Sequence, residues 1–169
     1  MTEPSHTEPA LSMPPAGAPA ASSPERTALI RRAGARLCTT LGWAALHEVR
    51  LPNGRRADLL ALLPDGRFAC IEIKSGLADF RADAKWPEYR DYADLLFFAV
   101  DTDFPHTVLP DDAGLIVCAG LEAALLRHPP GHRLAPARRR AMTQMFAALA
   151  AARLTRLLDP EAASPLRAD

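Results

Sequence analysis

The chain has 169 residues, a length typical of one domain rather than two. Apolar residues make up 49% and charged residues 24%, the usual mix of a globular protein, and no apolar run of about 18 residues is present to span a bilayer. Cys38, Cys70 and Cys118 are odd in number and lack a CxxC spacing, which excludes a disulfide scaffold and a zinc knuckle. No basic segment leads into an apolar stretch at the N-terminus, so we expect a cytoplasmic protein with no membrane partner.

The net charge is zero, but the charges are segregated along the chain. Residues 26–56 carry seven arginines and one acid, and residues 127–156 carry seven arginines and no acid. Between them, residues 57–126 hold thirteen acids against five bases. An acidic centre between two arginine-rich blocks suits a cation-binding site flanked by phosphate-binding surfaces. The alternative is a solvated surface in a chain that prefers arginine, since 18 of its 20 bases are arginine.

The N-terminal part of the chain divides into a tail and a first helix. Residues 1–24 are rich in Pro, Ala and Ser, which predicts a disordered tail. The folded domain is expected over 25–160, followed by a flexible tail at 161–169. Residues 22–25 (SSPE) supply a hydroxyl cap, a proline for the first turn and an acid near the positive end of a helix dipole. An apolar stripe at helical spacing follows and predicts a helix that runs to Gly42.

The segments after this helix change to a period of two, which predicts strands. Pro64, Asp65 and Gly66 separate two of these segments and predict a tight antiparallel hairpin. The expected elements are strands over 44–51, 56–63 and 68–74, a helix over 79–93 broken near Pro87, strands over 95–100 and 115–119, and a long helix over 137–158. This order predicts an α/β fold with a mixed, partly antiparallel sheet flanked by helices.

The hairpin brings two acids together. A three-residue loop places Asp58 directly opposite Glu72, with Cβ atoms about 5 Å apart. Glu72 and Lys74 are two residues apart on one strand, so all three side chains share one face of the sheet. A two-residue loop would instead send Glu72 to the other face. The register of this hairpin therefore decides whether the three residues form one site.

Two hard carboxylate oxygens suit Mg²⁺ or Mn²⁺, which bridge to phosphate oxygens and make a bound water a better nucleophile. Lys74 is expected to orient the attacking water and to stabilise the charge that develops at phosphorus. The pattern therefore predicts a metal-dependent hydrolase of phosphodiesters. A cross-strand ion pair between Lys74 and one carboxylate is the structural alternative.

These residues resemble a known family. The motifs RADLLAL at 56–62, IEIKS at 71–75, KWPEYRDYAD at 85–94 and LFFAV at 96–100 are similar to those of the MmcB-like bacterial DNA repair proteins. More widely, Asp58 with the Glu72-Ile73-Lys74 run looks like the PD-(D/E)XK nuclease superfamily. The resemblance extends over about 25–160 and implies a restriction-endonuclease-like core of a helix, three strands, a helix and a strand (αβββαβ).

The resemblance also implies an activity: an Mg²⁺-dependent or Mn²⁺-dependent DNA endonuclease in repair or damage tolerance. By motif position, Asp58 and Glu72 are implied metal ligands and Lys74 the catalytic lysine. Two departures from the family pattern are visible. Ala57, not Pro, precedes Asp58, and the first helix lacks the interior acid that many members use as a further ligand. We expect Glu48 on the first strand to replace it.

The helix expected after the motif offers further candidates. Glu88 and Tyr92 are four residues apart, hence on one helical face, and look like the Q-x-x-x-Y helix of some superfamily members. Lys85, Tyr89 and Tyr92 are accordingly predicted to contact DNA. Surface ion pairs and a half-buried pair of aromatic rings explain the same residues equally well.

Two groups of arginines are expected to bind the DNA phosphates. Arg55 and Arg56 lead into the strand of Asp58, while Arg138, Arg139 and Arg140 begin the last helix. Such contacts give affinity without sequence preference. The expected partners are damaged or branched DNA at the nucleoid and other repair proteins, in an oligomeric state that the sequence does not define. The alternative function is a DNA-binding or scaffolding module of a repair complex that keeps the nuclease fold without cutting.

Overall fold

The computed structural model describes residues 23–161. The tails predicted at 1–24 and 161–169 lie outside the described residues, apart from Ser23 and Pro24, which begin the first helix, and Glu161. None of the helices within residues 23–161 has the length and apolar character needed to cross a membrane.

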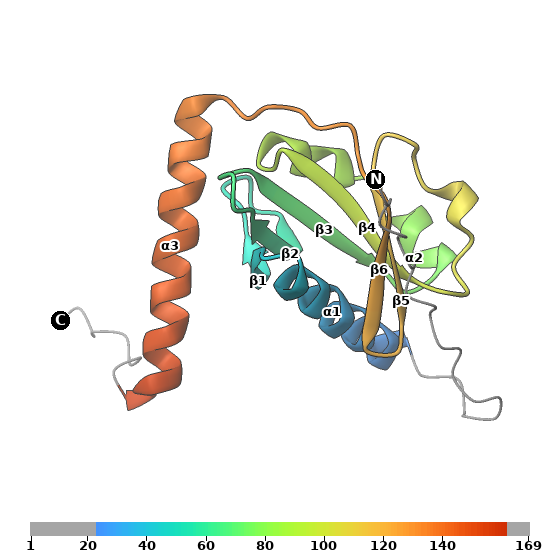
Figure 1. Ribbon diagram of the computed structural model, residues 1–169, viewed down its shortest axis with the longest axis horizontal. Helices are drawn as coiled ribbons and strands as arrows, with labels where there is room; N and C mark the ends of the chain where they lie inside the picture. The colour runs from blue at the N-terminus through green and yellow to red at the C-terminus, as the bar shows by residue number, and fades with distance from the viewer. Residues whose placement is uncertain (1–22, 162–169) are drawn as a thin grey trace, which may run out of the picture.

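Apart from β6 (Glu122–Arg127) and the short η2 (His106–Val108), the helices and strands follow one another in the expected order (Figure 1). The elements are α1 Ser23–Thr40, β1 Ala44–Arg50, β2 Arg56–Leu62, β3 Phe68–Lys74, α2 Leu77–Ala82, the 3-10 helix η1 Trp86–Asp91, β4 Leu95–Asp101, the 3-10 helix η2 His106–Val108, β5 Gly114–Ala119, β6 Glu122–Arg127 and α3 Pro136–Leu158. The first and last helices and the five expected strands are confirmed to within a residue or two at each end.

One mixed sheet of six strands forms the centre, in the order β1-β2-β3-β4-β5-β6. The strands β1, β2 and β3 pair antiparallel, β3, β4 and β5 pair parallel, and β6 returns antiparallel to β5. Every residue of the interior strand β3 is buried. The α/β class with a mixed sheet flanked by helices is confirmed.

Helices cover both faces of the sheet. Helix α1 crosses one face, where Ile30 and Ala33 pack on Ile71 and Phe97. The opposite face carries α2, η1 and α3, and α3 stands beside β1 and β2 (Figure 1). Alternation along β3 follows the prediction: Ala69, Ile71 and Ile73 belong to the α1 side, while Phe68 and Cys70 face α3 and η1. Glu72 and Lys74 follow Phe68 and Cys70 at every second position of β3, so their side chains point to the same face. The candidate site therefore lies on the face opposite α1.

Strand β6 has no counterpart among the predicted elements. Its sequence, EAALLR, is composed largely of residues with good helix propensity and shows no period of two. It becomes a strand because Gly120, at φ +60°, turns the chain back along β5. Since β6 is a half-exposed edge strand, tertiary pairing rather than local pattern determines its conformation.

The break expected near Pro87 in the helix over 79–93 is confirmed, but it spans residues 83–85, and the second half is a 3-10 helix. Helix α2 ends at Ala82, and η1 begins only at Trp86. Asp83 interrupts the helix, because its backbone is extended and its carboxylate accepts the backbone N–H of Lys85 at 3.0 Å. Pro87 lacks an N–H and follows in the first turn of η1.

Candidate active site

The hairpin register is the one that the three-residue loop predicts. Leu62 pairs with Phe68 and Leu59 with Ile71, and Gly66 adopts the left-handed conformation at φ +81°. The same register, continued by one residue, sets Asp58 opposite Glu72. The site therefore depends on a local feature, the turn between β2 and β3.

Side chains replace backbone pairing at this end of the hairpin. The ladder between β2 and β3 ends at Leu59 and Ile71. One residue further, Oδ2 of Asp58 accepts the backbone N–H of Ile73 at 2.9 Å. Oε1 of Glu72 lies 3.4 Å from the backbone N of Asp58 and 3.9 Å from Sγ of Cys70. The two carboxylates thus occupy the space between the strands and satisfy the backbone donors there.

Burial makes this acidic pair costly. Glu72 is only 4% exposed, and Asp58 is half-buried. Burial, followed by the negative charge of Asp58, raises the pKa of Glu72 from 4.5 to about 8. Burial also raises the pKa of Asp58, although the N–H of Ile73 and the charge of Arg31 oppose the rise. Because ionisation of both acids is unfavourable, the pair is most stable when the two carboxylates share either a proton or a cation.

Lys74 projects to the same side but is already paired. Its side chain is 5% exposed, and Nζ lies 2.5 Å from Oδ2 of Asp83, the residue that ends α2. Burial alone would raise the pKa of Asp83, but the hydrogen bond from Lys74 and the N–H of Lys85 outweigh it, and the pKa is lowered. Asp79 accepts the backbone N–H of Ser75 at 3.3 Å. The link between Asp83 and Lys74 was not predicted from the sequence, because it arises only where α2 stops.

Glu48 does not join the pair. Its neighbours His47 and Val49 pair with β2 on either side of Asp58, but Glu48 has φ +47°, a conformation uncommon for a residue other than glycine. Its carboxylate is 43% exposed and lies 3.1 Å from Arg31, with Arg56 at 3.8 Å. The proposed third ligand is therefore held by arginines, and this geometry does not support its assignment to a metal.

The predicted helper residues are dispersed by the break before η1. In a 3-10 helix the period is three, so Glu88 and Tyr92 do not share a face. Glu88 instead forms a bidentate ion pair with Arg55, with both hydrogen bonds at 2.9 Å. Tyr89 is buried, and its hydroxyl donates to the backbone carbonyl of Arg56 at 3.1 Å, which gives it a structural role in place of the predicted DNA contact. Tyr92 is half-buried under a guanidinium of α3.

The predicted phosphate-binding residues form two groups. Arg55 and Arg56, at the start of β2, and the exposed Lys85, beside Asp83, lie near the acidic pair. The three arginines at the start of α3, residues 138–140, lie at the other end of the sheet. There Arg138 stacks on Tyr92, with 5.5 Å from the guanidinium carbon to the ring centroid, and pairs with Asp91 at 3.6 Å.

Arg139 also has a structural role. It forms a bidentate ion pair with Asp94, at 2.5 and 2.9 Å, and donates to the carbonyl of Gly66 at 2.8 Å. Asp94 is 1% exposed and also accepts the backbone N–H groups of Phe68 and Leu134. Arg140 is exposed and has no ion pair with another described residue. Of the three arginines, Arg140 is thus the one whose guanidinium is available to a ligand.

The pair Asp58 and Glu72 fits a small divalent cation with few protein ligands. Within residues 23–161, no group of three or more His, Cys, Asp or Glu side chains is arranged to hold a metal. Two carboxylates nevertheless match the usual Mg²⁺ site, which has one or two protein carboxylates completed by water and substrate phosphate. The raised pKa values of Asp58 and Glu72 also favour a cation site, because a cation would relieve the repulsion between the two acids.

The fold and site define an α/β protein whose mixed sheet carries two carboxylates and a lysine on adjacent antiparallel strands. The chain belongs to the MmcB-like DNA repair protein family, whose model matches residues 15–161. The resemblance to the MmcB-like proteins is thereby confirmed, and the family indicates a role in DNA repair. A similar solved structure is the SPO1766 protein of unknown function from Silicibacter pomeroyi, with 39% sequence identity, 84% of this chain and 97% of that chain covered, and a TM-score of 0.78. No curated protein matches the chain significantly.

Proposed function

We propose that this protein hydrolyses phosphodiester bonds of DNA at the site formed by Asp58, Glu72 and Lys74, with Mg²⁺ or Mn²⁺ as cofactor. The observation that carries the proposal is the pairing of two buried or half-buried acids across the β2–β3 hairpin, on the same face as a buried lysine. Three ionisable groups on an interior part of a sheet are costly unless function retains them. The arrangement is consistent with the PD-(D/E)XK superfamily.

Each residue has a role that its surroundings support. Asp58 and Glu72 would hold the cation, which when bound supplies a Lewis acid for the phosphate and lowers the pKa of a coordinated water. Lys74 places a positive charge beside the scissile phosphate, where negative charge develops. Asp83 holds Lys74 in position through the ion pair at 2.5 Å. Arg56 and Lys85, both exposed, would contact the flanking phosphates.

Cleavage of a panel of nicked, flapped, branched and damaged duplexes tests the proposal. We expect the wild type to cut at least one of them with Mg²⁺ or Mn²⁺, and Asp58→Asn and Lys74→Met to reduce the rate by about a hundredfold or more, the usual effect of losing electrostatic stabilisation of the transition state. Glu122→Gln, on the exposed surface of β6, is the matched control and should cut normally. Equal activity in all four proteins would reject the assigned site.

A DNA-binding module without catalysis is the second candidate. Two observations favour it: Lys74 is already neutralised by Asp83, and the acidic pair lacks a third acid among the described residues. Binding of the same duplexes with no cleavage under any metal, together with unchanged binding by Asp58→Asn, would establish this function in place of hydrolysis.

A further inference from the structure

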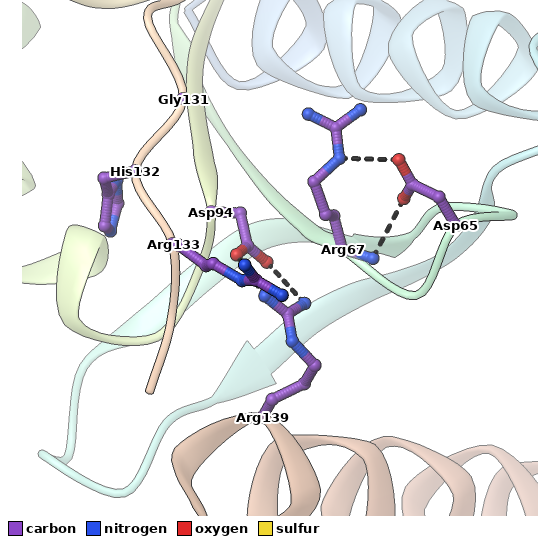
Figure 2. A pocket seen from close by; sticks show the side chains of 7 residues that line it. All are labelled: Asp65, Arg67, Asp94, Gly131, His132, Arg133 and Arg139. Carbon is purple, nitrogen blue, oxygen red and sulfur yellow. Dashed lines mark hydrogen bonds and ion pairs between the residues drawn. The ribbon is translucent and has the colours of Figure 1, made fainter. Parts of the chain in front are cut away.

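A basic groove lies at the end of the sheet opposite the acidic pair. It consists of three adjoining pockets of about 580, 510 and 470 Å³. The central pocket lies between the tip of the β2–β3 hairpin and the segment that leads into α3 (Figure 2). The central and second pockets share Asp65 and Arg67, and the central and third share Arg133 and Arg139, which makes the groove continuous.

The groove is positively charged. Its lining contains two histidines and four arginines against two acids: His128, His132, Arg67, Arg133, Arg139, Arg140, Asp65 and Asp94. Both acids are neutralised within it, because Asp65 pairs with Arg67 at 2.7 Å and Asp94 with Arg139. Arg133 and Arg140 are exposed and have no ion pair with a described residue. These two guanidinium groups are therefore available to an anionic ligand.

The pocket at the other end of the groove combines apolar side chains and one aromatic ring with the ion pair of Asp65 and Arg67. Leu41, Trp43, Leu63, Pro64 and Leu95 line it together with His128. Aromatic and apolar surface next to unpaired arginines matches a nucleotide strand whose bases are accessible for stacking. A duplex presents phosphates to the arginines but keeps its base faces stacked inside, so it leaves the apolar pocket unused.

We propose that this groove binds single-stranded DNA, with phosphates at Arg133 and Arg140 and an unpaired base against Trp43. Arg67 lines the groove and Glu72 lies five residues further along the chain, so about 17 Å of extended strand separates the groove from the acidic pair. That distance equals roughly five base-pair steps of duplex at 3.4 Å each. The inference adds a substrate class to the proposed function, namely DNA with a single-stranded branch beside a duplex, and its binding step is independent of cleavage.

Binding of a fluorescent oligo(dT) of about 12 nucleotides, in buffer with EDTA, tests the groove separately from hydrolysis. We expect Arg133→Ala and Arg140→Ala each to weaken binding by about tenfold. Each should also lower the slope of log affinity against log salt by about 0.7, the value for one phosphate contact on a single strand. Arg156→Ala is the matched control, since this exposed arginine lies on the same helix about 24 Å from Arg140. Asp58→Asn, which slows the proposed cleavage, should bind the oligonucleotide normally, because Asp58 does not line the groove.

Tryptophan fluorescence locates the base. In a Trp86→Phe background, where Trp43 is the remaining tryptophan, oligo(dT) should quench the emission and a blunt duplex of equal length should not. Absence of binding, an equal loss with Arg156→Ala, unchanged binding by both groove variants, or equal competition by the blunt duplex would each overturn the proposal. None of these results bears on cleavage at the acidic pair.

Discussion

The raised pKa of Glu72 can be tested by measuring how the free energy of unfolding depends on pH. Comparison of the wild type with Glu72→Gln isolates the contribution of this one carboxyl group. In the folded protein, burial and the charge of Asp58 raise the pKa of Glu72 to about 8, whereas its ordinary value is 4.5. Over the pH range between these values, the folded state keeps a proton that the unfolded chain has released. Because the folded state binds more protons, the free energy of unfolding of the wild type falls as the pH rises from 4.5 to about 8.

The size of the effect follows from the shift. Each pKa unit corresponds to about 1.4 kcal/mol, so the shift to about 8 sets an upper bound of about 5 kcal/mol. Asp58 titrates together with Glu72 and accounts for part of the interaction, so we expect about 3 kcal/mol from Glu72. Glutamine is neutral at every pH and nearly isosteric. Glu72→Gln should therefore have almost the stability of the wild type near pH 4.5 and exceed it by this amount at about pH 9.

Urea unfolding at several pH values, followed by circular dichroism, provides the measurement. Glu88→Gln is the control, because the hydrogen bond from Arg55 lowers the pKa of that exposed carboxylate and the variant should lose a little stability at high pH. Parallel stability curves for the wild type and Glu72→Gln would refute the reasoning. Mg²⁺ at about pH 8 should stabilise the wild type more than Glu72→Gln, since the variant keeps only the carboxylate of Asp58 as a charged ligand. If the pH effect occurs without any response to Mg²⁺, the buried pair is real and the proposed cofactor is wrong.

Three other substitutions test contacts on which the site or the fold depends. Asp83→Ala leaves the buried ammonium of Lys74 unpaired and should lower the free energy of unfolding by about 3 kcal/mol in urea. It should also reduce the cleavage rate, which Asp83→Asn partly restores because the amide still accepts the hydrogen bond. Asp94→Ala leaves two backbone N–H groups and a guanidinium without their acceptor and should cost about 3 to 5 kcal/mol, measured as a fall in Tm. Gly114→Ala places a Cβ 2.2 Å from a ring carbon of Phe97 and should cost about 2 kcal/mol by the same assay.

Two control variants make the same kind of substitution, Asp to Ala and Gly to Ala, at positions where the structure shows little to lose. Asp91→Ala removes a carboxylate that is 69% exposed, and we expect a change within about 0.5 kcal/mol. Gly76→Ala adds a Cβ with no other atom within 4 Å and should be similarly mild. A loss for Asp91→Ala equal to that of Asp94→Ala would contradict the structural role given to Asp94. Full retention of cleavage by Asp83→Ala would remove Asp83 from the positioning of Lys74.

Local patterns made much of the fold predictable. The two-residue alternation of β2 and β3 and the turn at Pro64, Asp65 and Gly66 depend on neighbours in the chain, so the register and the pairing of Asp58 with Glu72 follow from sequence. Turn chemistry alone excluded the register that would separate these acids.

Features that depend on distant contacts were not predictable in this way. Strand β6 exists because β5 offers it an edge, and its own residues favour a helix. Glu48 matched a ligand position by its place on β1, but the φ of +47° and the ion pair with Arg31 appear only in the assembled protein. Asp83 was visible in the sequence as a helix residue, and its contact with Lys74 required the helix to end there.

The hairpin couples the two proposed sites because β3 joins them. At its far end, the register sets Glu72 and Lys74 on the face of Asp58. At its tip, the carbonyl of Gly66 accepts Arg139, which anchors the start of α3 beside the groove. An insertion of one residue in this turn would send Glu72 to the α1 face and would also displace Arg139. Cleavage and single-strand binding should therefore be lost together in a register variant, although point substitutions at either end separate them.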